Sequence, residues 1–155
     1  MKDQILKKVE ESFLIAEKFY NRTFKRPQVI FKRNGTTAGY ARRDLSYLMF
    51  QLDFAEANEE DFINQIVPHE VAHSVQFEMF PRSKPHGYEW KFIMRCVMGL
   101  NPDRCHSYDV SVTKTKVHTY HTYACACGKE FQISTTIHNK ILKGQRRICL
   151  SCRNP

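Results

Sequence analysis

Two histidines four positions apart, with a glutamate directly after the first, form the most chemically suggestive pattern in the chain. The segment His69-Glu70-Val71-Ala72-His73 is an H-E-x-x-H motif. Side chains at positions i and i+4 share one face of a helix, with Cβ atoms roughly 5–6 Å apart, so two imidazoles can converge on one metal ion. Glu70 could then reach a metal-bound water without ligating the ion and take its proton. The motif therefore predicts a hydrolytic zinc site with Glu70 as the general base.

Such a site needs a third protein ligand and an open position for water. His86 is the preferred candidate, because Pro85 and Gly87 beside it favour a turn that returns it to the helix. Glu78 and Glu89 are rival ligands, although Glu78 would have to share one helix with both histidines. In the competing interpretation the five-residue match is accidental and the histidines are ordinary surface or core residues.

A second group of candidate ligands consists of four cysteines near the end of the chain. Cys125 and Cys127 form a C-x-C pair, and Cys149 and Cys152 form a C-x₂-C pair. Thiolates paired in two turns make closed tetrahedral zinc sites, although C-x-C is tighter than the usual spacing. Disulfides or free thiols are the alternative, and the lack of a recognisable export signal disfavours disulfides. We expect a structural zinc here that supplies folding energy to a piece too small for its own core.

The other cysteines and histidines show no spacing that indicates a site. Cys96 is expected to be a buried helix residue, and Cys105 is left over. The remaining histidines are expected to be structural or exposed: His106, His118, His121 and His138.

The elements that must position these residues follow from hydrophobic periodicity. Pro68 lies inside the second expected helix, which either begins there or is kinked. Gly144 offers a turn between the two strands expected after the first cysteine pair. The expected elements are helices at 3–20, 59–80 and 88–100, strands at 29–31, 39–42 and 46–54, and two ribbon strands at 131–137 and 146–148. The sequence therefore predicts an α+β fold, with helices on a sheet of about three strands in residues 1–112 and a small β zinc ribbon in residues 113–155.

The charge of the chain is concentrated near its C-terminus. The net charge is +8, and residues 111–155 carry eight Lys or Arg against one acid, Glu130, a net of +7. A neutral body with a basic end indicates a polyanionic partner such as DNA; a basic surface without a partner is the alternative. Basic groups near aromatic residues fit phosphate contact and base stacking, although the aromatics could instead form a small core. The candidate residues are Lys140, Lys143, Arg146 and Arg147, with Tyr120, Tyr123 and Phe131 nearby.

The composition is that of an ordinary globular protein, with 42% hydrophobic and 26% charged residues. We find neither an export signal at the N-terminus nor an apolar stretch long enough to span a membrane. We therefore expect a cytoplasmic monomer that meets no membrane.

Several segments together resemble the SprT-like zinc metalloproteases, especially the short bacterial members. They are Gly35-Thr36-Thr37-Ala38-Gly39, Ile66-Val67-Pro68-His69-Glu70-Val71-Ala72-His73, Pro85-His86-Gly87-Tyr88-Glu89-Trp90-Lys91, Cys105-His106-Ser107-Tyr108 and the paired cysteines. The resemblance covers most of the chain and includes the tight C-x-C spacing.

The resemblance implies a minimal zincin-like fold in which His69, His73 and His86 ligate a catalytic zinc and Glu70 is the base. The eukaryotic relatives, the Spartan proteases, degrade proteins crosslinked to DNA and are switched on by DNA. We expect this chain to lack their long C-terminal recruitment regions. Tyr88 and His106 are the candidates for stabilising the oxyanion.

Three functional hypotheses follow from these observations. The first is a zinc endopeptidase that acts on proteins near nucleic acid, and the intact Glu70 favours it. The second is a zinc-ribbon nucleic-acid-binding protein with little turnover. The third is a regulatory factor that binds other proteins and uses neither activity.

Overall fold

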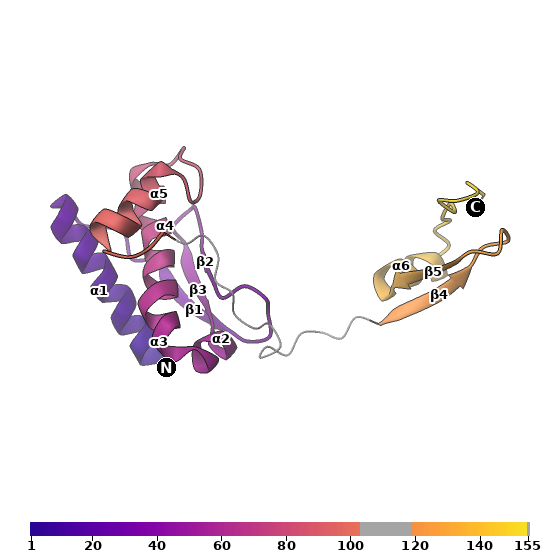
Figure 1. Cartoon of the computed structure of the whole chain (residues 1–155), viewed down its shortest axis with the longest axis horizontal. Coiled ribbons are helices and arrows are strands. Elements are labelled where there is room, and N and C mark those ends of the chain that lie inside the picture. The colour runs from indigo at the N-terminus through magenta and orange to yellow at the C-terminus, as the bar shows by residue number, and fades with distance from the viewer. Residues whose placement is uncertain (103–118, 155) are drawn as a thin grey trace. The chain divides into compact units, whose positions relative to one another are not determined.

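The computed structural model describes residues 1–102 and 119–154 (Figure 1). The chain divides into two compact units, Met1–Thr115 and Lys116–Pro155. The predicted α+β class is confirmed, with a three-stranded sheet and helices in the first unit and a pair of strands in the second. The predicted boundary between residues 112 and 113 lies outside the described residues.

The sheet of the first unit contains the three expected strands, β1 (Gln28–Lys32), β2 (Gly39–Ala41) and β3 (Tyr47–Gln51). Their order is β1-β3-β2, with β1 parallel and β2 antiparallel to β3. The third strand was predicted to run to residue 54 but ends at Gln51. The reason is a helix cap: the Gln51 side chain accepts a hydrogen bond from the Asp53 backbone N–H, which starts α2 (Leu52–Ala57).

The first helix, α1 (Lys2–Tyr20), confirms the predicted helix at 3–20. Its buried side chains recur at helical spacing and form one face: Ile5, Val9, Ser12, Phe13 and Ala16. Asn21 ends the helix in the left-handed conformation, with φ of 49°, and its N–H bonds to the carbonyl of Glu17. This face packs against the helix that carries the histidine motif (Figure 1).

The predicted helix at 59–80 is one continuous helical run built from three segments. These are α3 (Glu59–Asp61), the π-helical segment η1 (Phe62–Ile66) and α4 (Val67–Met79). Pro68 therefore neither starts nor breaks the run. It lies in the first turn of α4, directly after the π-helical segment, where its missing N–H is most easily tolerated. α4 lies between α1 and the sheet, and it contacts both β2 and β3.

A loop after α4 leads to α5 (Tyr88–Phe92) and the π-helical segment η2 (Ile93–Val97). The helix predicted at 88–100 therefore ends three residues early, before Gly99, which has a positive φ of 68°. The core of the unit lies between the helices and the sheet, and its largest fully buried side chains are Trp90, Phe13, Phe50, Phe54 and Phe62. Within the described residues, no helix combines the length and the apolar content needed to cross a membrane.

The second unit contains a hairpin of β4 (Tyr120–Ala124) and β5 (Glu130–Ser134), followed by α6 (Thr135–Leu142). The strand predicted at 131–137 is confirmed over residues 131–134, but its predicted pairing with a returning strand at 146–148 is wrong. The partner of β5 precedes it, and residues 146–148 form no strand. Ile137 and Ile141 are four residues apart, which is helical spacing, and both lie in the helix that the chain forms after Ser134.

Candidate metal centres

The three predicted histidine ligands meet at one place in the structure. His69 and His73 lie one turn apart on α4, and His86 comes from the loop between α4 and α5. The Nε2 atom of His86 lies 3.1 Å from that of His69 and 3.0 Å from that of His73. Ligand nitrogens around a tetrahedral zinc ion, each about 2.0–2.1 Å from the metal, would be about 3.3 Å apart. The donor set and its spacing therefore fit a zinc ion held by three imidazoles.

One fully buried indole lies against all three of these rings. The Trp90 ring centroid lies 4.7 Å from that of His69, 5.3 Å from that of His73 and 4.7 Å from that of His86. The His73 ring is also stacked on Phe77, at 5.5 Å. The backing of rigid aromatic rings restricts how the imidazoles can turn, which is a requirement for a preformed metal site.

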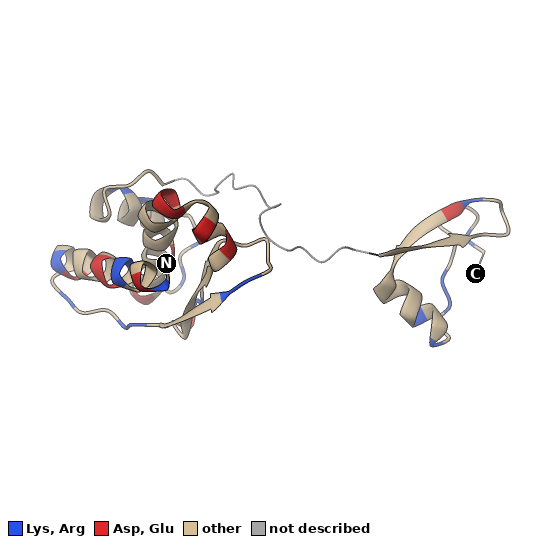
Figure 2. Ribbon diagram, turned by 90° about the horizontal axis from the view of Figure 1, so that it is seen from below, with Lys and Arg blue, Asp and Glu red and all other residues tan. Residues whose placement is uncertain are grey.

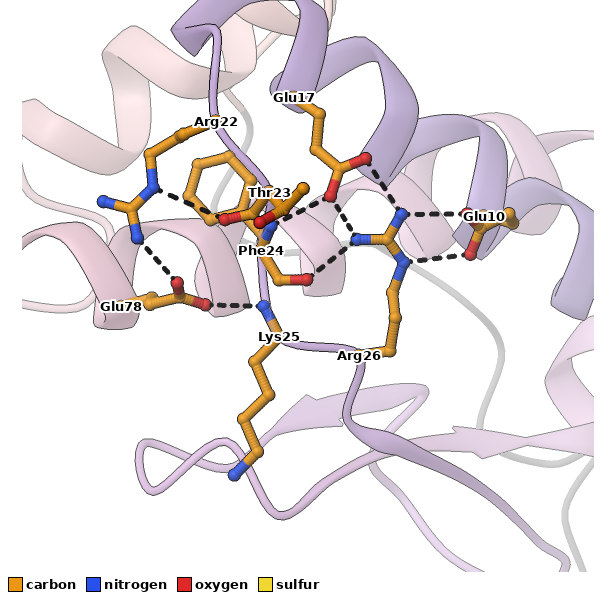
Figure 3. A network of polar contacts seen from close by, with 8 residues as sticks. All are labelled: Glu10, Glu17, Arg22, Thr23, Phe24, Lys25, Arg26 and Glu78. Carbon is orange, nitrogen blue, oxygen red and sulfur yellow. Dashed lines mark hydrogen bonds and ion pairs between the residues drawn. The ribbon is translucent and has the colours of Figure 1, made fainter.

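The rival ligand Glu78 is engaged elsewhere. Its carboxylate accepts a hydrogen bond of 2.9 Å from the Arg22 guanidinium and another of 2.9 Å from the Lys25 backbone N–H (Figure 3). Among the described residues, the potential ligand group at this place contains His69, His73 and His86 but not Glu89. Of the three candidates for the third ligand, the structure thus brings His86 to the other two histidines.

Glu70 lies one position after His69 on α4 and is only 6% exposed. Its carboxyl group accepts a hydrogen bond from the backbone N–H of Ala41 on β2. Gly39 makes this approach feasible, since a Cβ atom at that position would lie 2.7 Å from both Cγ and Oε1 of Glu70. Burial raises the pKa of Glu70 to about 8, and the Ala41 hydrogen bond opposes that rise only in part. Glu70 is therefore a buried carboxyl group with a raised affinity for a proton, on the helix that carries two of the histidines.

The imidazole of His73 is held in its neutral form. Burial lowers its pKa to about 3, and the neighbouring His69 and His86 rings act in the same direction. A neutral imidazole has a nitrogen lone pair to offer, so this electrostatic environment suits metal ligation.

The four predicted cysteine ligands also meet, in the second unit. The Sγ atoms of Cys125 and Cys152 lie 3.5 Å apart, and those of Cys127 and Cys149 lie 3.9 Å apart. All four are free thiols. Sulfurs around a tetrahedral zinc, each about 2.3 Å from the metal, would be about 3.8 Å apart. The cluster consequently fits a closed four-thiolate zinc site of the ribbon type.

The backbone around the cysteines is shaped to present their sulfurs. Gly128 adopts a positive φ of 82° and its N–H bonds to the carbonyl of Cys125, which forms the first turn. In the second turn, the backbone N–H groups of Cys152 and Ser151 lower the pKa of the Cys149 thiol, whereas the neighbouring thiols raise the pKa of Cys152. Backbone donors that favour the thiolate favour metal binding as well.

The four basic residues predicted to contact nucleic acid are all exposed. Figure 2 marks the Lys and Arg positions of the second unit in blue. Lys140 lies on α6, Lys143 directly follows it, and Arg146 and Arg147 lie in the segment that leads to Cys149. Of the nearby aromatics, Tyr120 is 59% exposed. Tyr123 and Phe131 are half-buried and form a cross-strand pair between β4 and β5.

Sequence reasoning missed several residues of the histidine centre. The sequence did not indicate that Trp90 packs against the three imidazoles or that Gln76 contacts His73. It also did not indicate that Gly39 lies beside Glu70. Their residue types are weak signals, because a tryptophan in an amphipathic helix or a glycine in a strand can be present for many structural reasons unrelated to a metal site.

The remaining cysteines and histidines give mixed outcomes. Cys96 was predicted to be buried but is exposed. His121 and His138 were expected to be structural or exposed, and in the structure they are half-buried and stack on each other with ring centroids 3.7 Å apart. Three residues noted in the sequence lie outside the described ones: Cys105, His106 and His118.

Comparison with known proteins agrees with this geometry. Residues 9–121 match the profile of the SprT-like family. A protein named Protein SprT from Pseudomonas paraeruginosa (strain DSM 24068 / PA7) is 41% identical over 156 residues, which span 99% of this chain and 93% of the relative. Another Protein SprT, from Pseudomonas savastanoi pv. phaseolicola (strain 1448A / Race 6), is 42% identical over 157 residues, spanning 100% and 94%. No solved structure matches the chain.

Proposed function

The chain belongs to the SprT-like family, and from this premise we propose that it is a zinc-dependent metalloendopeptidase that cleaves protein chains. The observation that carries the proposal is the convergence of three imidazole nitrogens, in which Nε2 of His86 lies 3.1 Å from that of His69 and 3.0 Å from that of His73, beside the helix that also bears Glu70. Zinc at His69, His73 and His86 would polarise a water and lower its pKa toward about 7. The four cysteines would hold a second, structural zinc.

In this proposal Glu70 takes a proton from the attacking water and later gives it to the leaving amine. Its environment supports the role. The side chain is almost fully buried, so bulk water does not compete for it, and the Ala41 N–H fixes the position of the carboxyl group. A carboxylate held in one place loses little freedom when the substrate arrives.

Strand β2 offers a place for the substrate backbone beside Glu70. In the described part of the sheet, β2 pairs with β3 only and so forms the edge. An edge strand can bind an extended peptide by continuing the sheet, with hydrogen bonds to main-chain groups of any sequence. This supports a substrate that can be locally extended, such as an unfolded protein segment.

The test of the proposal compares Glu70→Gln with the unchanged chain on a chemically unfolded protein. We expect cleavage to fall at least about 100-fold, the usual contribution of a positioned base, while two zinc ions per chain remain bound. Glu78→Gln is the matched control, because Glu78 lies on the same helix but faces Arg22. Undiminished cleavage by Glu70→Gln would remove this carboxylate from the mechanism.

We further propose that the second unit binds DNA and so directs the enzyme to DNA-associated proteins. The support is the charge of the described part of that unit, in which one acid accompanies six basic residues: Lys129, Lys140, Lys143, Arg146, Arg147 and Arg153. If the wild-type chain bound DNA but cleaved nothing, the alternative function of a nucleic-acid-binding or regulatory protein would replace the protease.

DNA binding is tested by its salt dependence. Each phosphate contact that is lost reduces the slope of log affinity against log salt by about 0.7–0.9. We expect the double variant Arg146→Ala/Arg147→Ala to weaken binding and to reduce that slope by about 1.4–1.8, as measured by fluorescence anisotropy at several salt concentrations. Binding that is independent of salt, or equal in both proteins, would contradict the proposed contact.

A further inference from the structure

Gln76 is a fully buried polar residue on α4, three positions after His73, to which the proposed reaction gives no role. Its side-chain amide makes three hydrogen bonds. Oε1 lies 3.2 Å from Nδ1 of His73, and Nε2 donates to the Ser83 hydroxyl and to the Lys84 carbonyl, each at 2.8 Å. One amide thus joins a candidate metal ligand to the loop that carries another.

The direction of every hydrogen bond in this group is fixed by backbone carbonyls. The Lys84 carbonyl can only accept, so the amide nitrogen of Gln76, and not its oxygen, must face the loop. The Ser83 hydroxyl donates its single hydrogen to the Phe80 carbonyl at 2.7 Å, so it accepts the other hydrogen of the amide. The oxygen of Gln76 is therefore turned toward His73.

An amide oxygen can only accept, so Nδ1 of His73 must carry the hydrogen. In the neutral imidazole the other nitrogen, Nε2, then has the free lone pair. This is the nitrogen that lies 3.0 Å from Nε2 of His86, on the side where the three rings meet. The Gln76 amide thus selects the tautomer of His73 that can ligate a metal there.

The same amide holds the backbone that presents His86. His86 has a positive φ of 56°, a conformation that a side chain with a Cβ rarely adopts and that its surroundings must stabilise. Ser83 and Lys84, which the amide binds, lie three and two residues before it, and the Gly87 N–H closes the turn onto the Lys84 carbonyl at 2.9 Å. Arg43 holds the loop independently, through bonds of 2.6 Å to the Pro81 carbonyl and 3.0 Å to that of Ser83.

We propose that Gln76 is a positioning residue that couples the tautomer of His73 to the placement of His86, so that two ligands are preorganised for zinc by one amide. The proposal rests on the proposed function, because it assigns Gln76 a role only if the three histidines hold a metal. Partners of ligating histidines typically change metal affinity 10- to 100-fold when they are removed.

The test titrates Zn²⁺ into the full chain against a chromophoric chelator, where two binding steps are expected. Gln76→Leu should weaken one step by about 10- to 100-fold and leave the cysteine step unchanged as an internal reference. Ser83→Ala, which removes only one of the loop contacts, should weaken the same step by a smaller factor. Because Arg43 still holds the loop, Gln76→Leu is expected to fold, and circular dichroism checks this.

The matched control is Gln51→Leu. Gln51 is also a buried glutamine, but its amide caps α2 and contacts Gly35 and Asp53 rather than a histidine. This variant should bind both zinc ions as the unchanged chain does. Equal loss of zinc affinity in Gln51→Leu and Gln76→Leu would mean that Gln76 affects zinc binding only through the stability of the fold, which would overturn the proposal.

A second readout needs no metal. In the metal-free chain, long-range ¹H–¹⁵N spectra of the imidazoles should show His73 protonated at Nδ1, and Gln76→Leu should give a mixture of tautomers. Gln76→Glu keeps an acceptor for Nδ1 and should keep that tautomer, while its zinc step is weakened because the loop donors are gone. If wild type shows only the cysteine step, the proposed function fails; if it shows both steps and Gln76→Leu matches it, only the positioning role fails.

Discussion

At the scale of single residues, the most demanding contact of the histidine centre is between a glycine and the proposed base. Gly39 lies where a Cβ atom would come within 2.7 Å of Glu70, closer than such atoms approach in folded proteins. The Glu70 side chain can therefore occupy this position beside β2 because position 39 has no side chain. This glycine in β2 therefore determines how closely the Glu70 carboxyl group can approach the strand.

Gly39→Ala should displace the Glu70 carboxyl group while the three histidines keep their places. We expect a destabilisation of about 1–3 kcal/mol from overpacking and a loss of activity of about 100-fold, the typical effect of a 1 Å misplacement. Thermal unfolding and cleavage of an unfolded protein measure the two effects. Gly35→Ala is the control, because its Cβ would meet only Gln51 Nε2, at an ordinary 3.9 Å.

A double variant identifies the cause of the destabilisation. Gly39→Ala/Glu70→Ala removes the side chain with which the new methyl group collides. The loss of stability in the double variant should therefore be smaller than the sum of the losses in the two single variants. Additive losses would show that Gly39 is needed for the strand itself and not for Glu70.

The residues of the centre differ in how well the sequence predicts them. His69, His73 and Glu70 were predictable because helix geometry alone places positions i and i+4 together. The prediction of His86 as a ligand depended on a turn in the loop after the helix, which Pro85 and Gly87 indicated. Gln76 was not predictable, since its role depends on which way the Lys84 carbonyl points, and spacing along the chain contains no such information.

At the scale of elements, α1 is tied to the segment that follows it by a compact group of ion pairs (Figure 3). The Arg26 guanidinium contacts Glu10 at 2.8 Å and Glu17 at 2.6 Å, and Glu17 also accepts a hydrogen bond from the Phe24 backbone N–H. These contacts lower the pKa of both carboxyl groups, that of Glu17 to about 2. The group fixes how the chain leaves α1 and enters β1.

The lowered pKa of Glu17 makes this part of the fold sensitive to acid. Its pKa in the folded chain is below its ordinary value of 4.5, so its contribution to stability is complete above about pH 4.5 and is lost as the pH falls from there toward 2. We expect the difference in Tm between the unchanged chain and Glu17→Gln to be largest near pH 7 and to shrink steadily below pH 4.5. Thermal denaturation from pH 3 to pH 7 measures it.

Glu11→Gln serves as the control for this experiment. Glu11 lies on the same helix, but its partner Lys8 is 3.7 Å away and both side chains are partly exposed. Its Tm difference should stay small across the whole pH range. A constant difference for Glu17→Gln over that range would contradict the assignment of the acid sensitivity to this carboxylate.

The success of the element predictions depended on how regular the periodicity was. α1 and the run from α3 to α4 have long apolar stripes, so their limits were predicted to within one or two residues. The second unit has short apolar runs, in which Phe131 and Ile133 fit a strand and Ile137 and Ile141 fit a helix. Tertiary contacts, such as those within the cluster of four cysteines, decide between such alternatives, and local sequence does not contain them.

At the scale of the whole molecule, the two units differ in what can hold them folded. The first has a core of fully buried aromatic and aliphatic side chains that extends from α1 to η2. In the described residues of the second, 119–154, no side chain is fully buried. A unit of this size with no buried core cannot offset the entropy of its chain without a further crosslink, and the four cysteines are the group that could provide one.

Removal of metal should therefore unfold the second unit and spare the first. We expect a strong chelator to move the amide NMR signals of residues 119–154 into the narrow range of an unfolded chain, while those of residues 1–102 keep their dispersion, because the first unit is held by its apolar core. Cys149→Ser should reproduce the loss in the second unit without a chelator, and His86→Ala should leave that unit intact. Retention of the dispersed signals of the hairpin after chelation would mean that its side chains alone stabilise it, and the four thiols would then have no structural metal to hold.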